Sequence, residues 1–249
     1  MQTIENEHTK YVRNLFGRIA GKYDLLNRLM TFGQDISWRK EAIRHLTLPE
    51  HGWVLDIGAG TGDFALEIRE NNPQLRIVAS DLTIEMVEIG RKRPHGEQVS
   101  WIIADALHLP FAKNSFERVV SGFLLRNVAD VNQALNEQFR CLLPGGYFAS
   151  LDTTQPSTNI LSPFIKIYLR VVIPTLGRFI AGVPEAYLYL PESTENFLKA
   201  EELAKRIRSA GFKSVNFVRR MFGTAAIHWG EKRQDHPLPM AKPAASNTE

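Results

Sequence analysis

Apolar and polar positions alternate along most of this chain in a way that predicts β-strands followed by α-helices. Short apolar runs end in a small or acidic residue, and each is followed by a segment whose apolar positions recur at helical spacing. This repeated change of period predicts βαβ units, and therefore a parallel sheet with helices on both faces. We expect strands at 53–57, 76–81, 99–104, 116–121 and 147–152, and helices at 64–70, 84–92 and 131–142.

The apolar pattern toward the C-terminus completes this sheet. A helix is expected at 200–210, ended by Gly211, and two further apolar patterns follow at 214–222 and 224–229. Because only Gly223 separates these two patterns, we predict an antiparallel hairpin. The predicted fold class is α/β: a Rossmann-like, seven-stranded, mostly parallel sheet with helices on both faces and an antiparallel last strand.

Three further segments flank or interrupt this alternation. Residues 1–48 are predicted to form an N-terminal helical cap, broken near Gly33, with Asp35 and Ser37 as N-cap candidates for its last helix. Residues 49–230 are predicted to form the α/β domain, with a helical insertion at about 159–190. The tail at 231–249 is rich in proline, alanine and polar residues, so we expect it to be disordered.

Composition and charge narrow the class of protein. The 249 residues suffice for one large domain, and 44% hydrophobic with 23% charged residues is typical of a globular protein. A net charge of +3 is too weak a bias for a nucleic-acid binder, although it favours contact with anionic lipid. The chain has a single cysteine, Cys141, so it cannot form an internal disulfide, which is typical of a cytoplasmic protein. We interpret Cys141 as a buried apolar residue rather than a nucleophile. No signal peptide or membrane-spanning segment is predicted.

The strongest chemical signal is a glycine turn after the first predicted strand. Gly58, Gly60 and Gly62 follow the apolar run 54–57, and Asp81 ends the next predicted strand about twenty residues later. An acid at that position can hold the two hydroxyls of a ribose. Asp105 ends a third predicted strand at the same edge. Together these residues predict a site for a ligand that carries adenosine.

The residue after the turn indicates which adenosine ligand binds. Asp63 falls in the first turn of the following helix, where it would repel a phosphate and suit a cation. S-adenosylmethionine carries a sulfonium and an ammonium and no phosphate, so we predict it as the cofactor, with no metal. The alternative is a glycine turn that serves only packing. The predicted cofactor-binding residues are Tyr23, Asp56, Gly58, Gly60, Thr61, Gly62, Asp81, Leu82, Asp105, Ala106 and Gly122.

Several motifs make the chain similar to a known family. It resembles the class I S-adenosylmethionine-dependent methyltransferases that C-methylate quinone precursors, the demethylmenaquinone and 2-polyprenyl-6-methoxybenzoquinol methyltransferases. The resemblance covers about residues 10–230, and Leu125-Arg126-Asn127-Val128 is its most specific motif. The other matching stretches are 12–16, 19–24, 38–40, the glycine turn, Asp105 with 109–111, 115–116, 144–146 and 189–193.

The chain departs from the family pattern at three places. The chain has Phe123-Leu124 before Leu-Arg-Asn, where the family usually has Phe-Gly. It has Leu143 before the Pro-Gly-Gly turn at 144–146, where the family usually has a basic residue. The stretch 152–154 is Asp-Thr-Thr, where the family usually has Glu-Phe-Ser. These positions face the region where the substrate is expected to bind, so they bear on the identity of the quinone more than on the type of reaction.

The implied chemistry requires a group that stabilises a phenolate. A quinol ring carbon is a poor nucleophile until an adjacent hydroxyl loses its proton. Arg126 is the first candidate for this role, with Asn127 orienting the same group; the alternative is that Arg126 only pairs with Asp130, four residues later. His228 is a possible base, but its place in a terminal strand favours a structural role. Tyr23 and Asp24 are expected to close over the cofactor, assisted by Lys22; the alternative is that they form a solvated helix end.

The predicted function is C-methylation of a prenylated quinol, either demethylmenaquinol to menaquinol or the equivalent ubiquinone-pathway step. One alternative is an enzyme that transfers a methyl group to O or N of another small hydrophobic acceptor. The others are an RNA methyltransferase and a non-catalytic scaffold protein. The sequence has no Asn-Pro-Pro-Tyr motif and no basic cluster that would support RNA as the substrate. The expected location is the cytoplasm, peripheral on the inner face of the membrane, and a homo-oligomer is compatible with the sequence. Membrane contact is expected through Phe164, Tyr168 and Val172, beside Lys166 and Arg170; the alternative is that this segment is a buried cap over the sheet whose charges are simply solvated.

Overall fold

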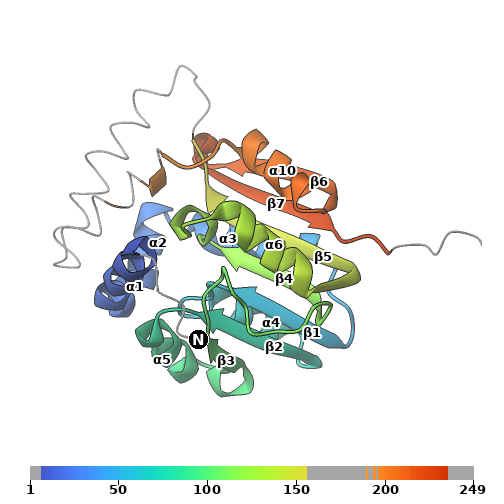
Figure 1. Cartoon of the computed structure of the whole chain (residues 1–249). Helices are drawn as coiled ribbons and strands as arrows, with labels where there is room; N and C mark the ends of the chain where they lie inside the picture. Colours follow the sequence, from blue (N-terminus) through green and yellow to red (C-terminus); the bar gives the residue numbers. More distant parts are fainter. Residues whose placement is uncertain (1–6, 156–188, 190–192, 195, 235–249) are drawn as a thin grey trace, which may run out of the picture.

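The computed structural model describes residues 7–155, 189, 193–194 and 196–234 of the chain (Figure 1). The predicted insertion at 159–190, apart from Tyr189, lies outside the described residues, together with the membrane contact expected there. The tail prediction can be compared only at 231–234, which the structure describes.

The described residues form a seven-stranded sheet in the order β3-β2-β1-β4-β5-β7-β6. Strands β1 to β5 are parallel, and β7 runs antiparallel to both β5 and β6, so the predicted fold class is confirmed. The strands are β1 (Gly52–Ile57), β2 (Leu75–Asp81), β3 (Ser100–Ile103), β4 (Phe116–Gly122), β5 (Leu142–Thr153), β6 (Lys213–Arg220) and β7 (Ala225–Glu231).

Helices cover both faces of this sheet (Figure 1). One face packs against α3 (Gln34–His45) and α4 (Asp63–Asn71), and the other against α6 (Val131–Cys141) and α10 (Ala200–Ser209). Helix α5 (Ile84–Lys92) lies beside β2 and β3. The cap comprises α1 (Glu7–Ile19), the 3₁₀ turn Ala20–Lys22 and α2 (Tyr23–Met30), followed by α3.

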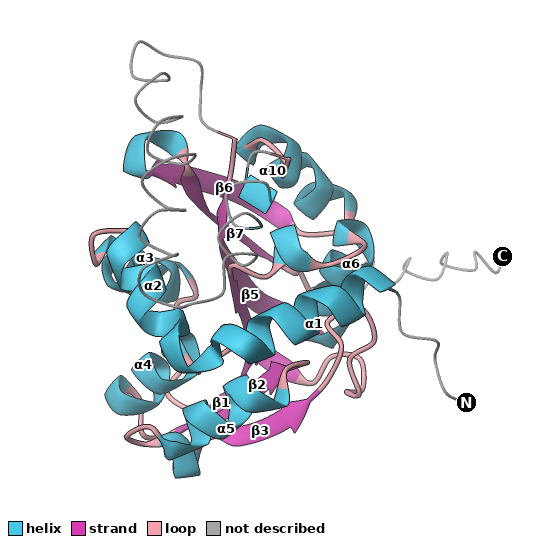
Figure 2. Ribbon diagram, turned by 90° about the vertical axis from the view of Figure 1, so that its left-hand side faces the viewer, coloured by secondary structure: helices cyan, strands magenta, loops and turns pink. Residues whose placement is uncertain are grey.

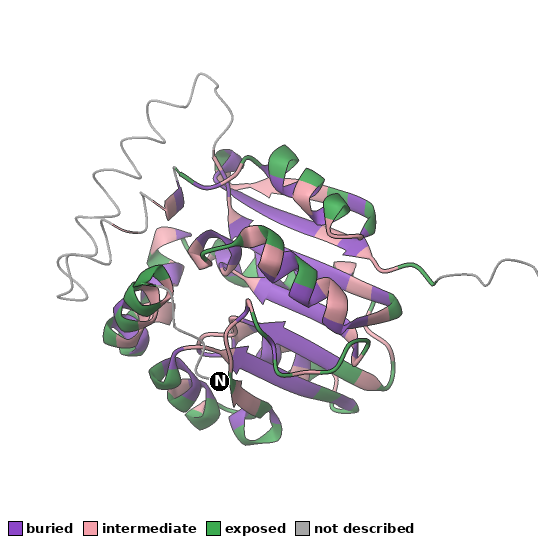
Figure 3. Cartoon of the chain, in the orientation of Figure 1, coloured by how far each residue is buried: buried purple, intermediate pink, exposed green. Residues whose placement is uncertain are grey.

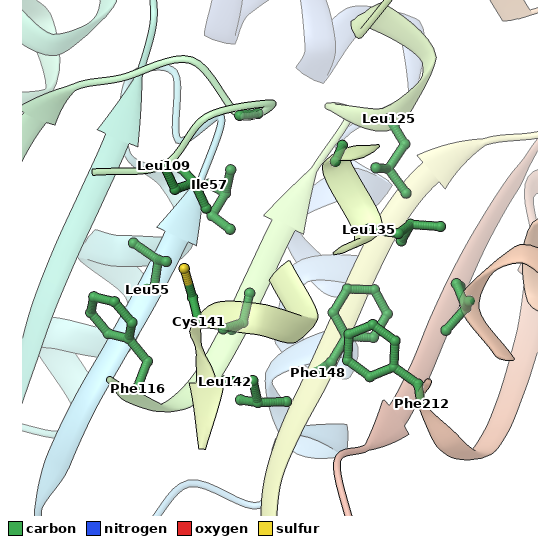
Figure 4. Close-up of a cluster of buried hydrophobic side chains, with 14 of the residues drawn as sticks. Leu55, Ile57, Leu109, Phe116, Leu125, Leu135, Cys141, Leu142, Phe148 and Phe212 are labelled. Carbon is green, nitrogen blue, oxygen red and sulfur yellow. The ribbon is translucent and has the colours of Figure 1, made fainter. Parts of the chain in front are cut away.

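The strands divide the core into two clusters because successive side chains point to opposite faces. Leu55 and Val119 join the cluster under α6 and α10, whereas Val54 and Val120 join the cluster under α3 and α4. Figure 3 shows the central strands as almost continuously buried, with exposed residues on the outer sides of the helices. Figure 4 shows Cys141 between the aliphatic and aromatic side chains of the first cluster. Burial raises the pKa of its thiol to about 11, in keeping with the structural interpretation.

Local geometry differs from the predictions at two places. The hairpin connection is a 3₁₀ turn, Met221–Gly223, in which Met221 and Phe222 both have positive φ, so β6 ends before these residues. Asp35 is not an N-cap: Gly33 occupies that position, with φ 73°, and the Asp35 carboxylate is fully buried. The pattern of apolar residues could not reveal either feature, because both are set by the backbone conformation of a tight turn rather than by the spacing of apolar side chains.

The cap lies across the carboxyl ends of the parallel strands. Figure 2, which faces this edge, shows α1 crossing in front of the strand ends and α2 and α3 beside them. A small cluster of Leu15, Ile19 and Leu26 forms the inside of the cap, with Phe16, Tyr23 and Tyr189 packed against it. The cap is therefore a wall of the edge where ligands bind in open α/β sheets.

A buried ion network fastens this cap to the sheet. Asp63, in the first turn of α4, lies 2.8 Å from Arg93 Nη1, 3.0 Å from Arg28 Nη2 and 3.3 Å from Arg39 Nη2. Arg28 and Arg39 also pair with Asp35, whose side chain has no exposed surface. Burial raises the pKa of the Asp63 carboxyl, but the three arginines outweigh burial and leave its pKa below the ordinary value. The network thus joins α2, α3 and α4 to the end of α5.

Asp35→Asn tests the contribution of this network. The substitution leaves Arg28 and Arg39 to share the single carboxylate of Asp63. Removing one charge from a buried network is destabilising, so we expect the free energy of unfolding to fall by about 3 kcal/mol in urea denaturation. Glu67→Gln is the matched control, because Glu67 pairs with the exposed Lys40 at 3.5 Å and should contribute about 0–1 kcal/mol. Equal small effects of both variants would contradict the anchoring role.

His228 provides a second test, through pH. Its ring is 1% exposed, Nε2–H donates to the Ala200 carbonyl oxygen at 2.9 Å, and buried Nδ1 has no hydrogen-bond partner among the described residues. Burial lowers the pKa of His228 from 6.5 to about 4, so between these values the unfolded chain binds the proton more readily. Above pH 6.5 His228 therefore does not lower the free energy of unfolding, whereas this free energy falls as the pH decreases from 6.5 toward 4.

We therefore expect His228→Gln to remove on the order of 3 kcal/mol of the acid-side loss in stability. The measurement is the difference between variant and wild type in urea denaturation at a series of pH values, since buried carboxyl groups titrate in both proteins. His51→Gln, which changes an exposed histidine, is the control. A constant difference between the wild type and His228→Gln across this pH range would refute the assignment.

Candidate functional site

A cavity opens where the carboxyl ends of β1, β2, β3 and β4 meet the cap. Its interior volume is about 100 Å³ and its mouth is open to solvent, so the enclosed part is smaller than the roughly 300–1,000 Å³ of sites that hold drug-sized ligands. Nine of the thirteen predicted site residues line it: Tyr23, Gly58, Gly60, Asp81, Leu82, Asp105, Ala106, Gly122 and Asn127. The strands bring these residues together from distant parts of the sequence.

The glycine turn is shaped so that the backbone can approach a ligand. Gly58, Gly60 and Gly62 have φ values of 64°, 57° and 90°, a region that side chains disfavour. A Cβ at Gly58 would lie 2.6 Å from Leu124 Cδ1, whereas one at Gly60 would face the cavity with only Tyr23 nearby, at 3.7 Å. Gly62 does not line the cavity; it precedes α4 as its N-cap residue.

Asp81 holds the turn and faces the cavity. Its Oδ2 accepts from the Gly60 N–H at 2.7 Å, and its Oδ1 accepts from the Thr83 N–H at 2.8 Å. Burial raises the pKa of Asp81, and these backbone hydrogen bonds oppose the rise. Each carboxylate oxygen retains a lone pair, so the same side chain can accept from a ligand hydroxyl while it positions the turn.

Asp56 lies behind the turn rather than in the wall of the main cavity. Its side chain is 1% exposed, Oδ2 accepts from the Ala65 N–H at 3.1 Å, and Oδ1 has no hydrogen-bond partner among the described residues. Burial raises the pKa of Asp56 to about 7. It borders a smaller recess, together with Tyr23 and Thr61, that continues from the glycine turn.

Thr61 and Asp63, next to the glycine turn, make contacts with the cap rather than with the cavity. Thr61 Oγ1 donates to Asp24 Oδ1 at 2.6 Å, so its hydroxyl faces α2. The charge of Asp63 is already compensated by three arginines. The interpretation of Asp63 as a partner for a cationic ligand is therefore not supported, and the choice of cofactor depends on the cavity and on the comparisons below.

Arg126 lies beneath the cavity rather than in its wall. Its side chain is 3% exposed and its guanidinium lies over the Phe123 ring at 5.1 Å, while Phe123 itself lines the cavity. Nη1 is 3.6 Å from Asp152 Oδ1, beyond hydrogen-bond distance, and the buried Nε has no hydrogen-bond partner among the described residues. The alternative pairing with Asp130 is not found, because Asp130 caps α6 and the ionic partner is Asp152.

Asn127 connects the cavity to two other segments. Its side-chain N–H donates to the Phe123 carbonyl oxygen at 2.7 Å, and its Oδ1 accepts from the Tyr189 hydroxyl at 3.0 Å. The Asn127 backbone carbonyl oxygen lies 3.3 Å from His8 Nε2 at the start of α1. Tyr189 also packs edge-on against Tyr11, so Asn127 helps to hold α1 across the cavity.

The sequence analysis missed the wall that α1 provides. Thr9, Val12, Arg13 and Phe16 line the cavity, although the motif 12–16 was noted only as part of the resemblance. An amphipathic pattern in α1 could have indicated a packed face, but not that this face borders a ligand site. His228 lies outside the lining, as expected for a structural residue. No metal-binding group of three or more His, Cys, Asp or Glu side chains occurs in the described part of the chain.

Comparisons with known proteins agree with this geometry. The chain is 45% identical over 221 residues to the ubiquinone/menaquinone biosynthesis C-methyltransferase UbiE of Desulfotalea psychrophila, covering 89% of this chain and 90% of that protein. It is 37% identical over 228 residues to the demethylmenaquinone methyltransferase of Roseiflexus castenholzii, covering 92% and 96%. A SAM-dependent methyltransferase structure from Thermotoga maritima matches with a TM-score of 0.64 at 22% identity, covering 88% and 99%, which shows the shared fold.

The model of the ubiE/COQ5 methyltransferase family matches residues 2–232, a range that includes the glycine turn, the cavity and the Arg126 motif. Because this match spans nearly the whole chain and the relatives agree with it, the chain belongs to the ubiE/COQ5 methyltransferase family and its cofactor is S-adenosylmethionine.

Proposed function

We propose that this methyltransferase transfers the methyl group of S-adenosylmethionine to a ring carbon of a prenylated quinol. The step from demethylmenaquinol to menaquinol, or its ubiquinone-pathway equivalent, is the reaction that its relatives' names support. The structural observation that carries the proposal is the buried Arg126 guanidinium. It lies over the ring of Phe123, which lines the cavity, and its Nε–H has no hydrogen-bond partner among the described residues.

The cofactor fits the strand-end part of the cavity. Asp81 would accept from the ribose hydroxyls, and the glycine turn would allow the backbone to approach the amino-acid part of the ligand. Asp105 and Ala106, with Leu82, border the adenine end in this arrangement. Tyr23 and Gly122 lie beside the glycine turn, so they would border the methyl group and the acceptor.

The reaction is an in-line displacement. The bond between sulfur and the methyl carbon breaks, a bond from the methyl carbon to the ring carbon forms, and neutral S-adenosylhomocysteine leaves. The ring carbon then loses its proton to solvent, which restores an aromatic phenolate. This phenolate takes up a proton in place of the one that the hydroxyl released at the start, so the net products are the methylated quinol, S-adenosylhomocysteine and one proton. Chain residues must align the two reactants, exclude water and stabilise the phenolate that makes the ring carbon nucleophilic.

Arg126 would supply the positive charge for that phenolate. Its guanidinium is held by Asp152 at 3.6 Å and by the Phe123 ring, and it retains donors. A guanidinium in a site that excludes water stabilises a developing anion more strongly than one in water. Asn127, which lines the cavity, would orient the acceptor or the water that receives its proton.

The surroundings of the cavity favour a hydrophobic acceptor over RNA. Val12 and Phe16 from α1, with Leu124 and Val128 after β4, line the space beside Gly58 and Gly122. A ring with an apolar tail matches this lining, whereas a polynucleotide requires a basic groove. We also propose that the enzyme works at the cytoplasmic surface of a membrane, because a prenyl tail partitions into the bilayer and the single cysteine is compatible with the cytoplasm. No described helix is long and apolar enough to cross a bilayer.

The test of the function is methyl transfer from isotopically labelled S-adenosylmethionine to a panel of demethylated quinols, with total RNA as a parallel acceptor. We expect label in the quinol fraction and none in RNA, detected by mass spectrometry. Transfer to RNA, or to no quinol in the panel, would contradict the proposal.

Asp81→Ala tests the cofactor site. The substitution removes the acceptor for the ribose hydroxyls and leaves the Gly60 N–H without its partner. Losing a buried acceptor costs about 1–3 kcal/mol, so we expect S-adenosylmethionine affinity to fall by about tenfold or more in calorimetry. Glu88→Ala, on the exposed side of α5, is the control. Unchanged affinity for the Asp81 variant would withdraw this assignment.

Arg126→Lys tests the catalytic role. Lysine keeps the charge but loses the planar donors, so we expect kcat to fall by about tenfold or more while cofactor affinity stays within about twofold. Arg118→Lys is the matched control: Arg118 is also a buried arginine, but its guanidinium donates to the Thr47 carbonyl oxygen. The control should lose stability and keep kcat. Near-normal turnover of Arg126→Lys would return Arg126 to a structural role.

A further inference from the structure

One apolar side chain of the cavity wall, that of Leu124, has no part in the chemistry described above. Leu124 follows the last residue of β4 by two positions and lines the cavity together with Gly58 and Gly122. Its side chain carries no group that can donate or accept a hydrogen bond or take up a proton. Any effect of Leu124 on the reaction must therefore come from the space that it occupies.

The side chain of Leu124 packs directly on the first glycine of the turn. A Cβ on Gly58 would lie 2.6 Å from Leu124 Cδ1 and 3.2 Å from both Leu124 Cβ and Cγ. Gly122, at the end of β4, is covered instead by a core residue, because a Cβ there would lie 2.7 Å from Phe64 Cε2. Leu124 is thus the side chain that bounds the cavity beside Gly58.

The main chain on both sides of Leu124 is anchored. The Phe123 N–H donates to the Leu151 carbonyl oxygen at 2.7 Å, and the Asn127 N–H donates to the Leu124 carbonyl oxygen at 2.9 Å. The Leu124 side chain also packs against the core cluster under α6 and α10. A ligand that enters the cavity therefore meets Leu124 as part of a wall with a defined shape.

The size of the residue at position 124 separates this chain from the family pattern. The family usually has glycine before Leu-Arg-Asn, and this chain has leucine. A glycine there would leave this part of the wall without a side chain. The difference concerns the region where the reactants meet in the proposed function, because Tyr23 and Gly122 line the cavity beside the same glycine turn.

The enclosed part of the cavity is small enough for one side chain to matter. Its interior volume is about 100 Å³. Closely packed walls do not accommodate added volume without strain. In an apolar pocket, one methylene group more or less changes the specificity of an enzyme by roughly 10- to 200-fold. A leucine in this wall is therefore large enough to discriminate between acceptor rings that differ by one substituent.

We propose that Leu124 sets an upper limit on the size of the acceptor ring, so that the enzyme selects quinols with small ring substituents over otherwise identical quinols with larger ones. This inference rests on the proposed function, because the quinol ring must enter the part of the cavity that Leu124 borders. Leu124 acts here by exclusion and takes no part in bond making. If Leu124 served only the packing of the core, its truncation would lower stability and leave selectivity unchanged.

The experiment measures kcat/KM for two series of short-tailed demethylated quinols, one of benzoquinols and one of naphthoquinols. Within each series, one ring substituent is hydrogen, methyl, methoxy or ethoxy. In a series that the wild type methylates, we expect kcat/KM to fall by about tenfold or more from the hydrogen to the ethoxy compound. Leu124→Ala should reduce this ratio to about threefold or less, because the truncated side chain leaves space for the substituent. Each ratio compares two substrates of one variant, so a partly unfolded preparation does not change it.

Two further variants serve as controls. Leu198→Ala is the matched control, because Leu198 is also a partly buried leucine packed against the same core cluster, but it does not line the cavity. This variant should keep the wild-type ratio. Leu124→Met keeps the volume of the side chain, so its ratio should stay within about twofold of the wild-type ratio.

Three outcomes would overturn the size limit: no dependence of kcat/KM on substituent size in the wild type, equal ratios for the wild type and Leu124→Ala, or equal changes of the ratio in Leu124→Ala and Leu198→Ala. A fall in the free energy of unfolding of Leu124→Ala with an unchanged ratio would assign Leu124 to core packing alone.

Binding of the same quinols to the enzyme with S-adenosylhomocysteine, measured by calorimetry, separates this inference from the proposed function. A size limit on binding that Leu124→Ala removes, without methylation of any quinol, would contradict the proposed reaction and support the size limit. Methylation of quinols of every size by the wild type would support the reaction and contradict the size limit. Neither binding nor methylation of any quinol would contradict both.

Discussion

The carboxylate of Asp63 is the point on which the arrangement of the site depends. Three arginines from different segments converge on it, two of them from the cap. Because Asp63 begins the helix that follows the glycine turn, the same contact fixes the turn and the cap relative to each other. Buried ion pairs contribute less to stability than their number suggests, but they strongly disfavour arrangements in which one partner is left alone. The network therefore selects the closed position of the cap more than it stabilises the fold.

The closed cap makes the site a cavity rather than an open edge. Without α1 and Tyr23, the glycine turn and Asp81 would face solvent, as the strand ends of an α/β sheet do when nothing covers them. With the cap in place, these groups face a partly enclosed cavity, and the charge of Arg126, which is 3% exposed, acts in a medium of low polarity. The pKa of Tyr23 lies above its ordinary value because burial outweighs the nearby positive charge of Arg126. In the proposed function, this one structural element would enclose the cofactor, border the acceptor and shape the electrostatics of the site.

Sequence pattern was sufficient for the fold and for the half of the site that lies on strand ends. Asp81 and Gly60 were predictable because a period-two apolar run must end at the sheet edge, and parallel strands bring their ends together. Pattern was not sufficient for Asp35 and Asp63, which looked like residues of helix starts. Their partners are Arg28, Arg39 and Arg93, which lie on other segments and up to thirty-five positions from Asp63 in the sequence. Only the packing of the cap decides which charges meet.

The most direct measurement of the central claim is the position of the transferred methyl group. A demethylated quinol is incubated with the enzyme and S-adenosylmethionine carrying a carbon-13 methyl group, and the product is examined by carbon NMR. The account predicts a labelled methyl group bonded to a ring carbon, with the chemical shift of an aryl methyl group. A labelled methyl group on oxygen, with the shift of an aryl ether, would contradict it.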